Sequence, residues 1–160
     1  MRLALYIGDH SSDTWIVRLG WWATRLVQKG KYAQVTHVEA IHAEHDDGTV
    51  TIASASIRDG GVRIKRCVLD TDHWMIADVP SWDVAKSIQW FTEHLGEKYD
   101  ARGAFASAMP IQWKTSNRWF CNESVSAPFL ECPEIFGPSQ FAAIAFTIGE
   151  DVTNRFFRKW

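Results

Sequence analysis

Two aspartate-glycine turns divide the middle of the chain into strand-length segments, and they constrain the fold more than any other feature. Asp46-Asp47-Gly48 and Asp59-Gly60-Gly61 are strong turn sequences, and residues 49–56 between them have the length and composition of a strand. Residues 34–42 before the first turn and residues 62–69 after the second have the same character. Because short turns join antiparallel neighbours, the sequence predicts an antiparallel meander.

Further elements are expected on both sides of this meander. They are strands at residues 2–7 and 73–79, and helices at residues 11–29, 80–95 and 101–109 and from Cys121 to Pro128, with an irregular stretch around Pro133 and Pro138. The sheet then has about four or five strands, and the fold class is α+β. No linker or charged block interrupts the 160 residues, which predicts one domain over residues 1–160.

Charge and composition narrow the function classes. Seventeen Lys and Arg against nineteen Asp and Glu give a net charge of −2, so no nucleic-acid partner is expected. No apolar run is long enough for a membrane-spanning helix, and the run at residues 3–7 is too short for a secretory signal. A cytoplasmic location is the default expectation, with access to the cell envelope by another route left open. Three cysteines are too few for a disulfide scaffold, and at least one thiol is expected to be free.

Cys121 is the candidate nucleophile. It follows the aromatic pair Trp119-Phe120 and begins a polar run with helical character over residues 122–127. The start of a helix offers unpaired backbone N–H groups and the positive end of the helix dipole, both of which stabilise a thiolate. The same N–H groups can hold an oxyanion. The alternative is a buried structural cysteine, because free cysteine also packs as a small hydrophobic residue.

His37 is the candidate base. It shares one face of the predicted strand with Glu39, because side chains two residues apart in a strand point the same way. Glu39 is therefore expected to accept a hydrogen bond from one imidazole nitrogen and leave the other free for the thiol proton. The alternative for His37 is a half-buried histidine with a purely structural role.

A metal site is a competing interpretation of the same segment, which carries His37, Glu39, His42, Glu44 and His45. Strand alternation divides this group, because His42 and Glu44 point away from the other three. No His-Glu-x-x-His spacing on a helix is present. A solvated strand end is the favoured interpretation, and neither a metal nor any other cofactor is expected.

Four short motifs form a recognisable series. They are Thr36-His37-Val38-Glu39, Asp59-Gly60-Gly61-Val62, Lys98-Tyr99-Asp100 with Gly103, and Trp119-Phe120-Cys121-Asn122-Glu123. The series resembles the circularly permuted, papain-like branch of the NlpC/P60 superfamily, the YiiX/YebB-like group, and within it small bacterial and phage-associated members. The distinguishing feature is the order of the pair, with His before Cys, and the resemblance covers roughly residues 1–147.

The resemblance implies a papain-like fold, in which a helix that begins at Cys121 packs on an antiparallel sheet that carries His37. It also implies a polar third residue, for which Glu39 is the first choice and Ser54 the alternative. Tyr99 resembles a site-lining tyrosine of the family. Asn122 stands where serine is more usual after the nucleophile, and we expect it to line the site as well.

The resulting expectation is a thiol hydrolase that cleaves an amide or peptide-type bond, including one derived from peptidoglycan, through Cys121 and His37. Two alternatives stay open. The same pair serves in a lipid or thioester acyltransferase or an esterase, which a groove lined by Trp21, Trp113, Trp119 and Trp160 would favour. A catalytically inactive binding module would keep the fold without the reaction. The expected partner is a peptide, a peptidoglycan fragment or an acyl substrate.

Overall fold

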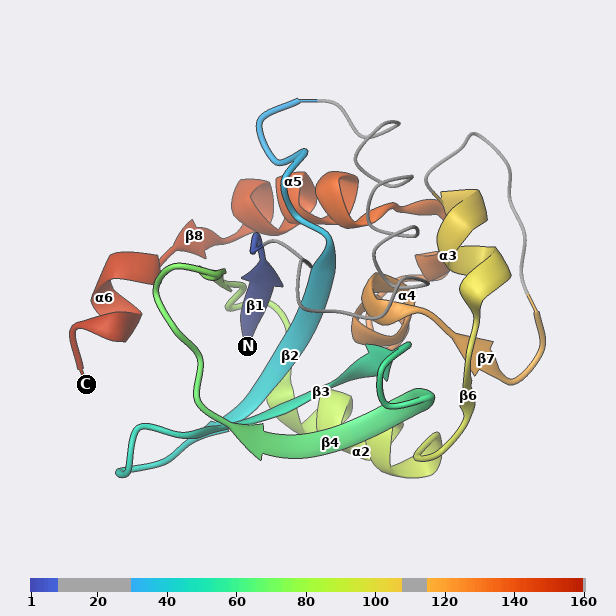
Figure 1. The fold of residues 1–160 in the computed structure, drawn as a ribbon, viewed down its shortest axis with the longest axis horizontal. Helices are drawn as coiled ribbons and strands as arrows, with labels where there is room; N and C mark the ends of the chain where they lie inside the picture. Colours follow the sequence, from blue (N-terminus) through green and yellow to red (C-terminus); the bar gives the residue numbers. More distant parts are fainter. Residues whose placement is uncertain (9–29, 108–114, 160) are drawn as a thin grey trace.

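The computed structural model describes residues 1–8, 30–107 and 115–159 of the chain (Figure 1). The strands are β1 (Arg2–Tyr6), β2 (His37–Glu44), β3 (Val50–Ser56), β4 (Gly61–Cys67), β5 (Trp74–Asp78), β6 (Lys98–Tyr99), β7 (Arg118–Trp119) and β8 (Glu150–Asp151). The helices are α2 (Val84–Glu93), α3 (Ala101–Ser107), α4 (Cys121–Ser126), the 3₁₀ helix η1 (Pro133–Ile135), α5 (Pro138–Ile148) and α6 (Thr153–Phe157). The helix expected at residues 11–29 lies outside the described residues.

The α+β class is confirmed, but the sheet is larger than predicted and is mixed. Its described strands number eight, in the order β7-β6-β4-β3-β2-β1-β5-β8. The meander β2-β3-β4 is antiparallel, as the two turns predicted, whereas β6 and β7 pair in parallel. Strands β6, β7 and β8 have two residues each, too short to produce an alternating pattern that sequence reasoning can detect.

Strand β5 does not continue the meander beside β4. It pairs instead with the opposite side of β1, so that β1 lies between β2 and β5. The connection contains Asp70, whose carboxylate accepts hydrogen bonds from the backbone N–H groups of Asp72 and His73 at 3.1 and 2.9 Å. Leu69 of the same connection is buried against the sheet. The segment therefore crosses the sheet as a packed connection and not as a hairpin turn.

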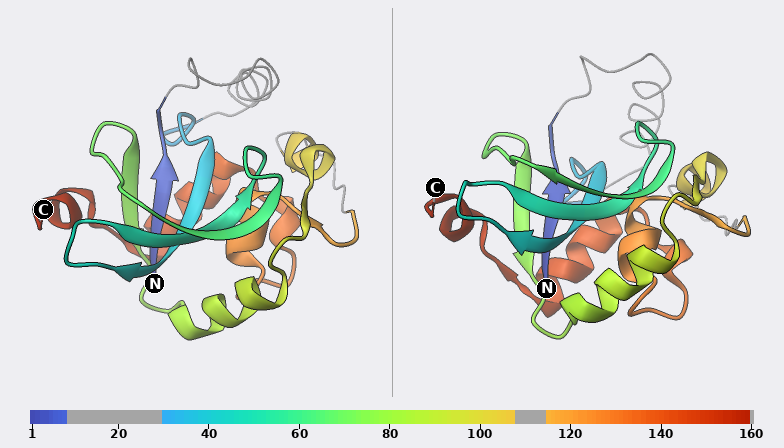
Figure 2. Two further views of the ribbon diagram at one scale, coloured as in Figure 1. Left: turned by 60° about the horizontal axis from the view of Figure 1, so that its bottom comes forward. Right: turned by 90° about the horizontal axis from the view of Figure 1, so that it is seen from below.

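Helices cover the two faces of the curved sheet unequally (Figure 2). One face packs against α2, α4 and α5, and its core joins apolar side chains of the strands to Phe91, Val125 and Phe141 from these three helices. The other face carries a smaller core with Phe156 of α6. Alternation along β1 shows the division, because Leu3 and Leu5 belong to the first core and Ala4 to the second.

Helix boundaries differ from expectation at two prolines. Helix α2 begins three residues after Ser81, because the Asp83 carboxylate caps it by accepting the Ala85 N–H at 2.8 Å. Pro138 begins α5 where an irregular stretch was expected, since proline fits the first turn of a helix without losing a hydrogen bond. As predicted, α4 ends before Pro128. None of the helices within the described ranges is long and apolar enough to cross a membrane.

Candidate active site

Helix α4 begins at Cys121, and its neighbours fix that residue against the sheet. The Ser124 hydroxyl accepts the backbone N–H of Ala55 in β3 at 2.9 Å and donates to the Cys121 carbonyl oxygen at 2.8 Å. The Glu123 carboxylate accepts the Phe120 N–H at 3.3 Å and caps the helix start. These bonds tie the first turn of α4 directly to β3.

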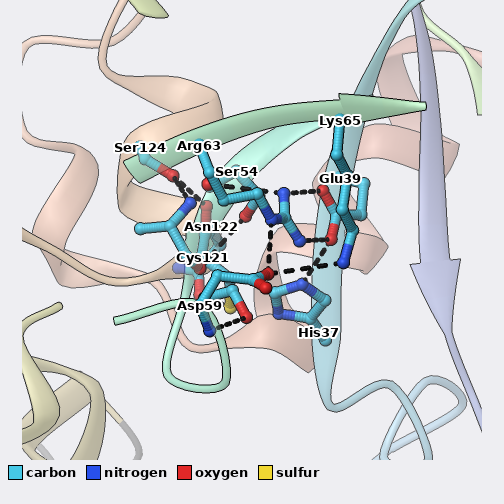
Figure 3. A network of polar contacts seen from close by, with 11 residues as sticks. His37, Glu39, Ser54, Asp59, Arg63, Lys65, Cys121, Asn122 and Ser124 are labelled. Atoms are coloured by element: carbon cyan, nitrogen blue, oxygen red, sulfur yellow. Dashed lines mark hydrogen bonds and ion pairs between the residues drawn. The ribbon is translucent and has the colours of Figure 1, made fainter. Parts of the chain in front are cut away.

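His37 is the first residue of β2, and Glu39 follows on the same face. His37 Nε2 and Glu39 Oε1 lie 2.7 Å apart, the distance of a charge-assisted hydrogen bond. Cys121 of α4 lies close enough to His37 to help raise the pKa of its imidazole. The structure thus brings the three residues expected to carry the chemistry into one cluster, in the order Cys121, His37, Glu39 (Figure 3).

The cluster is mostly shielded from solvent. Cys121 is 4% exposed and Glu39 is 2% exposed, whereas the His37 side chain is 22% exposed. The imidazole is therefore the part of the cluster with the most solvent contact.

Burial and pairing act in opposite directions on His37 and Glu39. Burial disfavours the charged imidazolium, but the Glu39 carboxylate and the nearby Cys121 outweigh it and raise the pKa of His37 to about 9. Burial alone would also raise the pKa of Glu39, yet His37 and Arg63 lower it to about 2. At neutral pH the pair is therefore an imidazolium beside a carboxylate.

Arg63 in β4 is a site residue that the sequence analysis missed. Its Nη1 donates to Glu39 Oε2 at 2.6 Å, its Nη2 donates to Glu39 Oε1, and its Nε donates to Asp59 Oδ2 at 2.8 Å. Lys65 Nζ lies 3.3 Å from the same Asp59 oxygen. Figure 3 shows the guanidinium between the two carboxylates. The side chains therefore form a row of alternating charges, which starts at the imidazole and consists of His37, Glu39, Arg63, Asp59 and Lys65.

A signal for Arg63 existed in the sequence. The turn at residues 59–61 sets the register of β3 and β4, which places Arg63 opposite Ser54. A charged residue on an alternating strand is usually solvent-exposed, so Arg63 was not expected to pair with a buried group. The strand register nevertheless brings it across Ser54 to Glu39. Following the register across both turns of the meander would have paired the two charges.

The other expected site residues are distributed unevenly. Cys121 Sγ donates to Asn122 Oδ1 at 3.6 Å, while Asn122 Nδ2 donates to the Phe136 carbonyl oxygen. Tyr99 is half-buried, and burial first and then the neighbouring Cys121 raise the pKa of its phenol, which keeps it protonated. The Ser54 hydroxyl donates to the Ala55 carbonyl oxygen at 3.3 Å. Glu39, and not Ser54, is thus the group placed on the imidazole.

The His and Glu side chains of the segment considered as a metal site have separate partners and do not converge on one point. His42 Nε2 lies 3.0 Å from the Ser87 hydroxyl, and His45 Nε2 lies 2.8 Å from the Thr51 hydroxyl. Glu44 pairs with Arg2 and Lys159. In the described part of the chain, no three His, Cys, Asp or Glu side chains are grouped as metal ligands would be.

The remaining thiols and tryptophans have other surroundings. Cys67 is half-buried, and burial followed by the charge of Glu39 raises its pKa. Cys132 is exposed. Trp119 packs edge-on against Trp90 with ring centres 4.8 Å apart. The other tryptophans considered for a groove, residues 21, 113 and 160, lie outside the described residues.

Comparisons of the chain with protein-family models, with curated proteins and with solved structures give no match.

Proposed function

We propose that the protein is a thiol hydrolase that cleaves an amide or peptide-type bond, with Cys121 as nucleophile, His37 as acid and base, and Glu39 as the group that orients His37. The observation that carries this proposal is the cluster in which His37 lies 2.7 Å from Glu39 and close enough to Cys121 for that residue to affect its pKa (Figure 3). A nucleophile, a base and an orienting carboxylate in hydrogen-bond sequence are the recurrent arrangement of covalent acyl transfer.

Acylation begins when the Cys121 thiol proton moves to His37, which leaves a thiolate beside an imidazolium that Glu39 stabilises. Cys121 Sγ bonds to the substrate carbonyl carbon, and the carbonyl oxygen takes up the negative charge. The Cys121 N–H has no acceptor within α4, because it belongs to the first turn, and it donates to this oxyanion. The carbon–nitrogen bond then breaks while His37 gives its proton to the leaving amine.

Deacylation restores the starting state. Water attacks the thioester carbon, neutral His37 accepts the water proton, and the carbon–sulfur bond breaks to release a carboxylic acid and the Cys121 thiolate. Glu39 lies 2.7 Å from Nε2 in the structure, from where it stabilises the imidazolium at both steps in which it forms. These two steps balance with the substrate, water and the side chains of Cys121 and His37 alone.

An amide fits this charge state better than an ester does. An amine leaves only after it gains a proton, and an imidazolium with a pKa of about 9 holds that proton at neutral pH. The permuted papain-like relationship, with peptidoglycan-type peptides as substrates, is part of the same proposal. The packing of α4 on β2 and β3 supports it, because the nucleophile helix then lies on the sheet that carries the histidine.

Intact-mass measurement after brief mixing tests the reaction. We expect wild-type protein to gain the mass of one acyl group from an activated peptide ester and to release free carboxylate from a short peptidoglycan-type peptide amide. Cys121→Ser is expected to lose both, because the serine hydroxyl is a far weaker nucleophile than a thiolate. Cys132→Ser is the matched control and should behave as wild type, since Cys132 is exposed outside the cluster.

Two results would contradict the proposal in different ways. A stable adduct with an activated fatty ester, discharged only when an alcohol or amine is added, would establish acyl transfer in place of hydrolysis. No adduct with either substrate class, in protein whose Cys121 is reduced, would establish a binding module.

A further inference from the structure

We propose that Arg63 is a positioning residue that holds the Glu39 carboxylate ionised and in one orientation, and that Asp59 in the turn between β3 and β4 holds Arg63 in turn. The catalytic meaning of this inference rests on the proposed function of Cys121, His37 and Glu39. The contacts themselves are independent of any substrate.

Arg63 grips both oxygens of Glu39. Nη1 donates to Oε2 at 2.6 Å and Nη2 donates to Oε1, so the guanidinium binds the carboxylate through two hydrogen bonds, which fix direction as well as charge. Oε1 also lies 2.7 Å from His37 Nε2. One carboxylate oxygen thus serves the arginine and the histidine together, and rotating the carboxylate would break both contacts.

Burial makes this grip necessary. Glu39 is 2% exposed, and a carboxylate so shielded from water binds a proton unless positive charges replace the lost hydration. His37 supplies one such charge and the Arg63 side chain, itself 13% exposed, supplies the other. A protonated Glu39 would no longer balance the imidazolium that the reaction needs.

Asp59 fixes the far side of the guanidinium. Its Oδ2 accepts Arg63 Nε at 2.8 Å and also pairs with Lys65 at 3.3 Å. The Arg63 Nη1 is 3.4 Å from the Ser54 carbonyl oxygen, which limits rotation from the β3 side. The turn that carries Asp59 contains Gly60 at φ +81°, a backbone conformation that favours glycine. The turn is thereby connected to the imidazole through three ion pairs, Asp59–Arg63, Arg63–Glu39 and Glu39–His37.

The charged and titratable groups around this row come from four elements. His37 meets Glu39 of its own strand and Cys121 of α4. Glu39 meets Arg63 of β4, and Cys67 of the same strand also senses its charge. Tyr99 of β6 lies close enough to sense Cys121. Of these, Arg63 is the partner whose loss removes positive charge from Glu39 without touching the nucleophile or the base.

The test is a carbon-13 NMR titration of the Glu39 side-chain carboxyl in wild type, Arg63→Gln, Arg63→Lys and Arg66→Gln. We expect Arg63→Gln to move the Glu39 midpoint upward by about 1 to 3 pH units, the usual effect of one neighbouring opposite charge. Arg63→Lys should move it less, because lysine keeps the charge but not the two-bonded grip. Arg66→Gln is the matched control, since Arg66 lies on the same strand and pairs with the exposed Asp47.

The same variants give a second measurement, the pH dependence of Cys121 alkylation by iodoacetamide. Its acid limb should move in the direction of the Glu39 midpoint in Arg63→Gln and return toward wild type in Arg63→Lys. A Glu39 midpoint that stays at the wild-type value in both variants overturns the inference. If Arg63→Gln does not fold, Arg63→Lys alone decides by the same criterion.

The two proposals fail separately. If no acyl-enzyme forms but the Glu39 midpoint shifts in Arg63→Gln, the hydrolase proposal is rejected and the positioning role of Arg63 stands. An active hydrolase in which neither variant shifts the midpoint rejects the positioning role alone.

Discussion

The ion pair between His37 and Glu39 predicts a specific dependence of stability on pH. The pKa of His37 is raised from 6.5 to about 9 in the folded protein, a difference of about 2.5 pH units. Because the folded state holds this proton more tightly than the unfolded state does, the raised pKa of His37 contributes fully to stability below pH 6.5. The contribution is lost as the pH rises through about 9.

The magnitude follows from the conversion of about 1.4 kcal/mol for each pH unit, which gives an upper value of about 3 kcal/mol. Glu39→Gln removes the largest influence that raises the pKa of His37 and leaves the burial that lowers it. The pKa of His37 should then fall to its ordinary range or below. The free energy of unfolding of this variant should therefore lose its His37-dependent decline between pH 6.5 and about 9.

Urea unfolding, followed by tryptophan fluorescence across this pH range, measures the effect. The absolute stability of Glu39→Gln will fall as well, because Arg63 loses its carboxylate partner, so the slope with pH and not the value at one pH is the readout. Glu44→Gln is the matched control on the same strand, since Glu44 pairs with Lys159 near the surface. A wild-type slope in Glu39→Gln would refute the assignment of the raised pKa to the ion pair.

Three further outcomes are expected from the structure. Ser124→Ala should lower the free energy of unfolding by about 1–3 kcal/mol in urea titrations, because it leaves a buried backbone N–H of β3 without its acceptor. Ser126→Ala, equally buried but donating only to carbonyls of its own helix, should change it far less. Gly61→Ala should lower the melting temperature and disturb β6, since an added Cβ would lie 2.0 Å from a backbone oxygen of the adjoining segment. At mildly acidic pH, peptide mapping should find Cys121 alkylated before Cys132. Exposure alone predicts the opposite order, because Cys132 is the more exposed thiol. Alkylation of Cys132 first, or of both at equal rates, would therefore contradict the assignment of Cys121 as nucleophile.

Local geometry explains what the sequence predicted correctly. The contact between His37 and Glu39 follows from the two-residue period of a strand, which holds wherever β2 sits in the sheet. The start of α4 at Cys121 and its end before Pro128 are likewise decided by a few adjacent residues. Both features depend on neighbours in sequence, where backbone preferences act directly.

Long-range pairing explains what the sequence did not predict. The position of β5 beside β1 depends on a connection that crosses the sheet, and its apolar residues would satisfy either neighbour. Arg63 depends on the combined register of two hairpins before it meets Glu39. The start of α5 at Pro138 is different, because a local rule does predict it: proline is favoured at the first position of a helix. The sequence analysis instead treated this proline as a residue that breaks a helix.

The row of charges behind Cys121 connects stability to reactivity in this fold. Each charge from His37 to Asp59 is paired with a neighbour of opposite sign, and the desolvation cost of the buried Glu39 carboxylate is offset only while His37 and Arg63 are in place. Removing a member in the middle takes one partner from each of two neighbours, whereas removing Lys65 at the exposed end leaves Asp59 with water and Arg63. Effects of substitution should therefore decrease outward along the row, and pairs of substitutions within it should not add. The imidazole is at the inner end, where the loss of any interior partner changes both its charge and its direction.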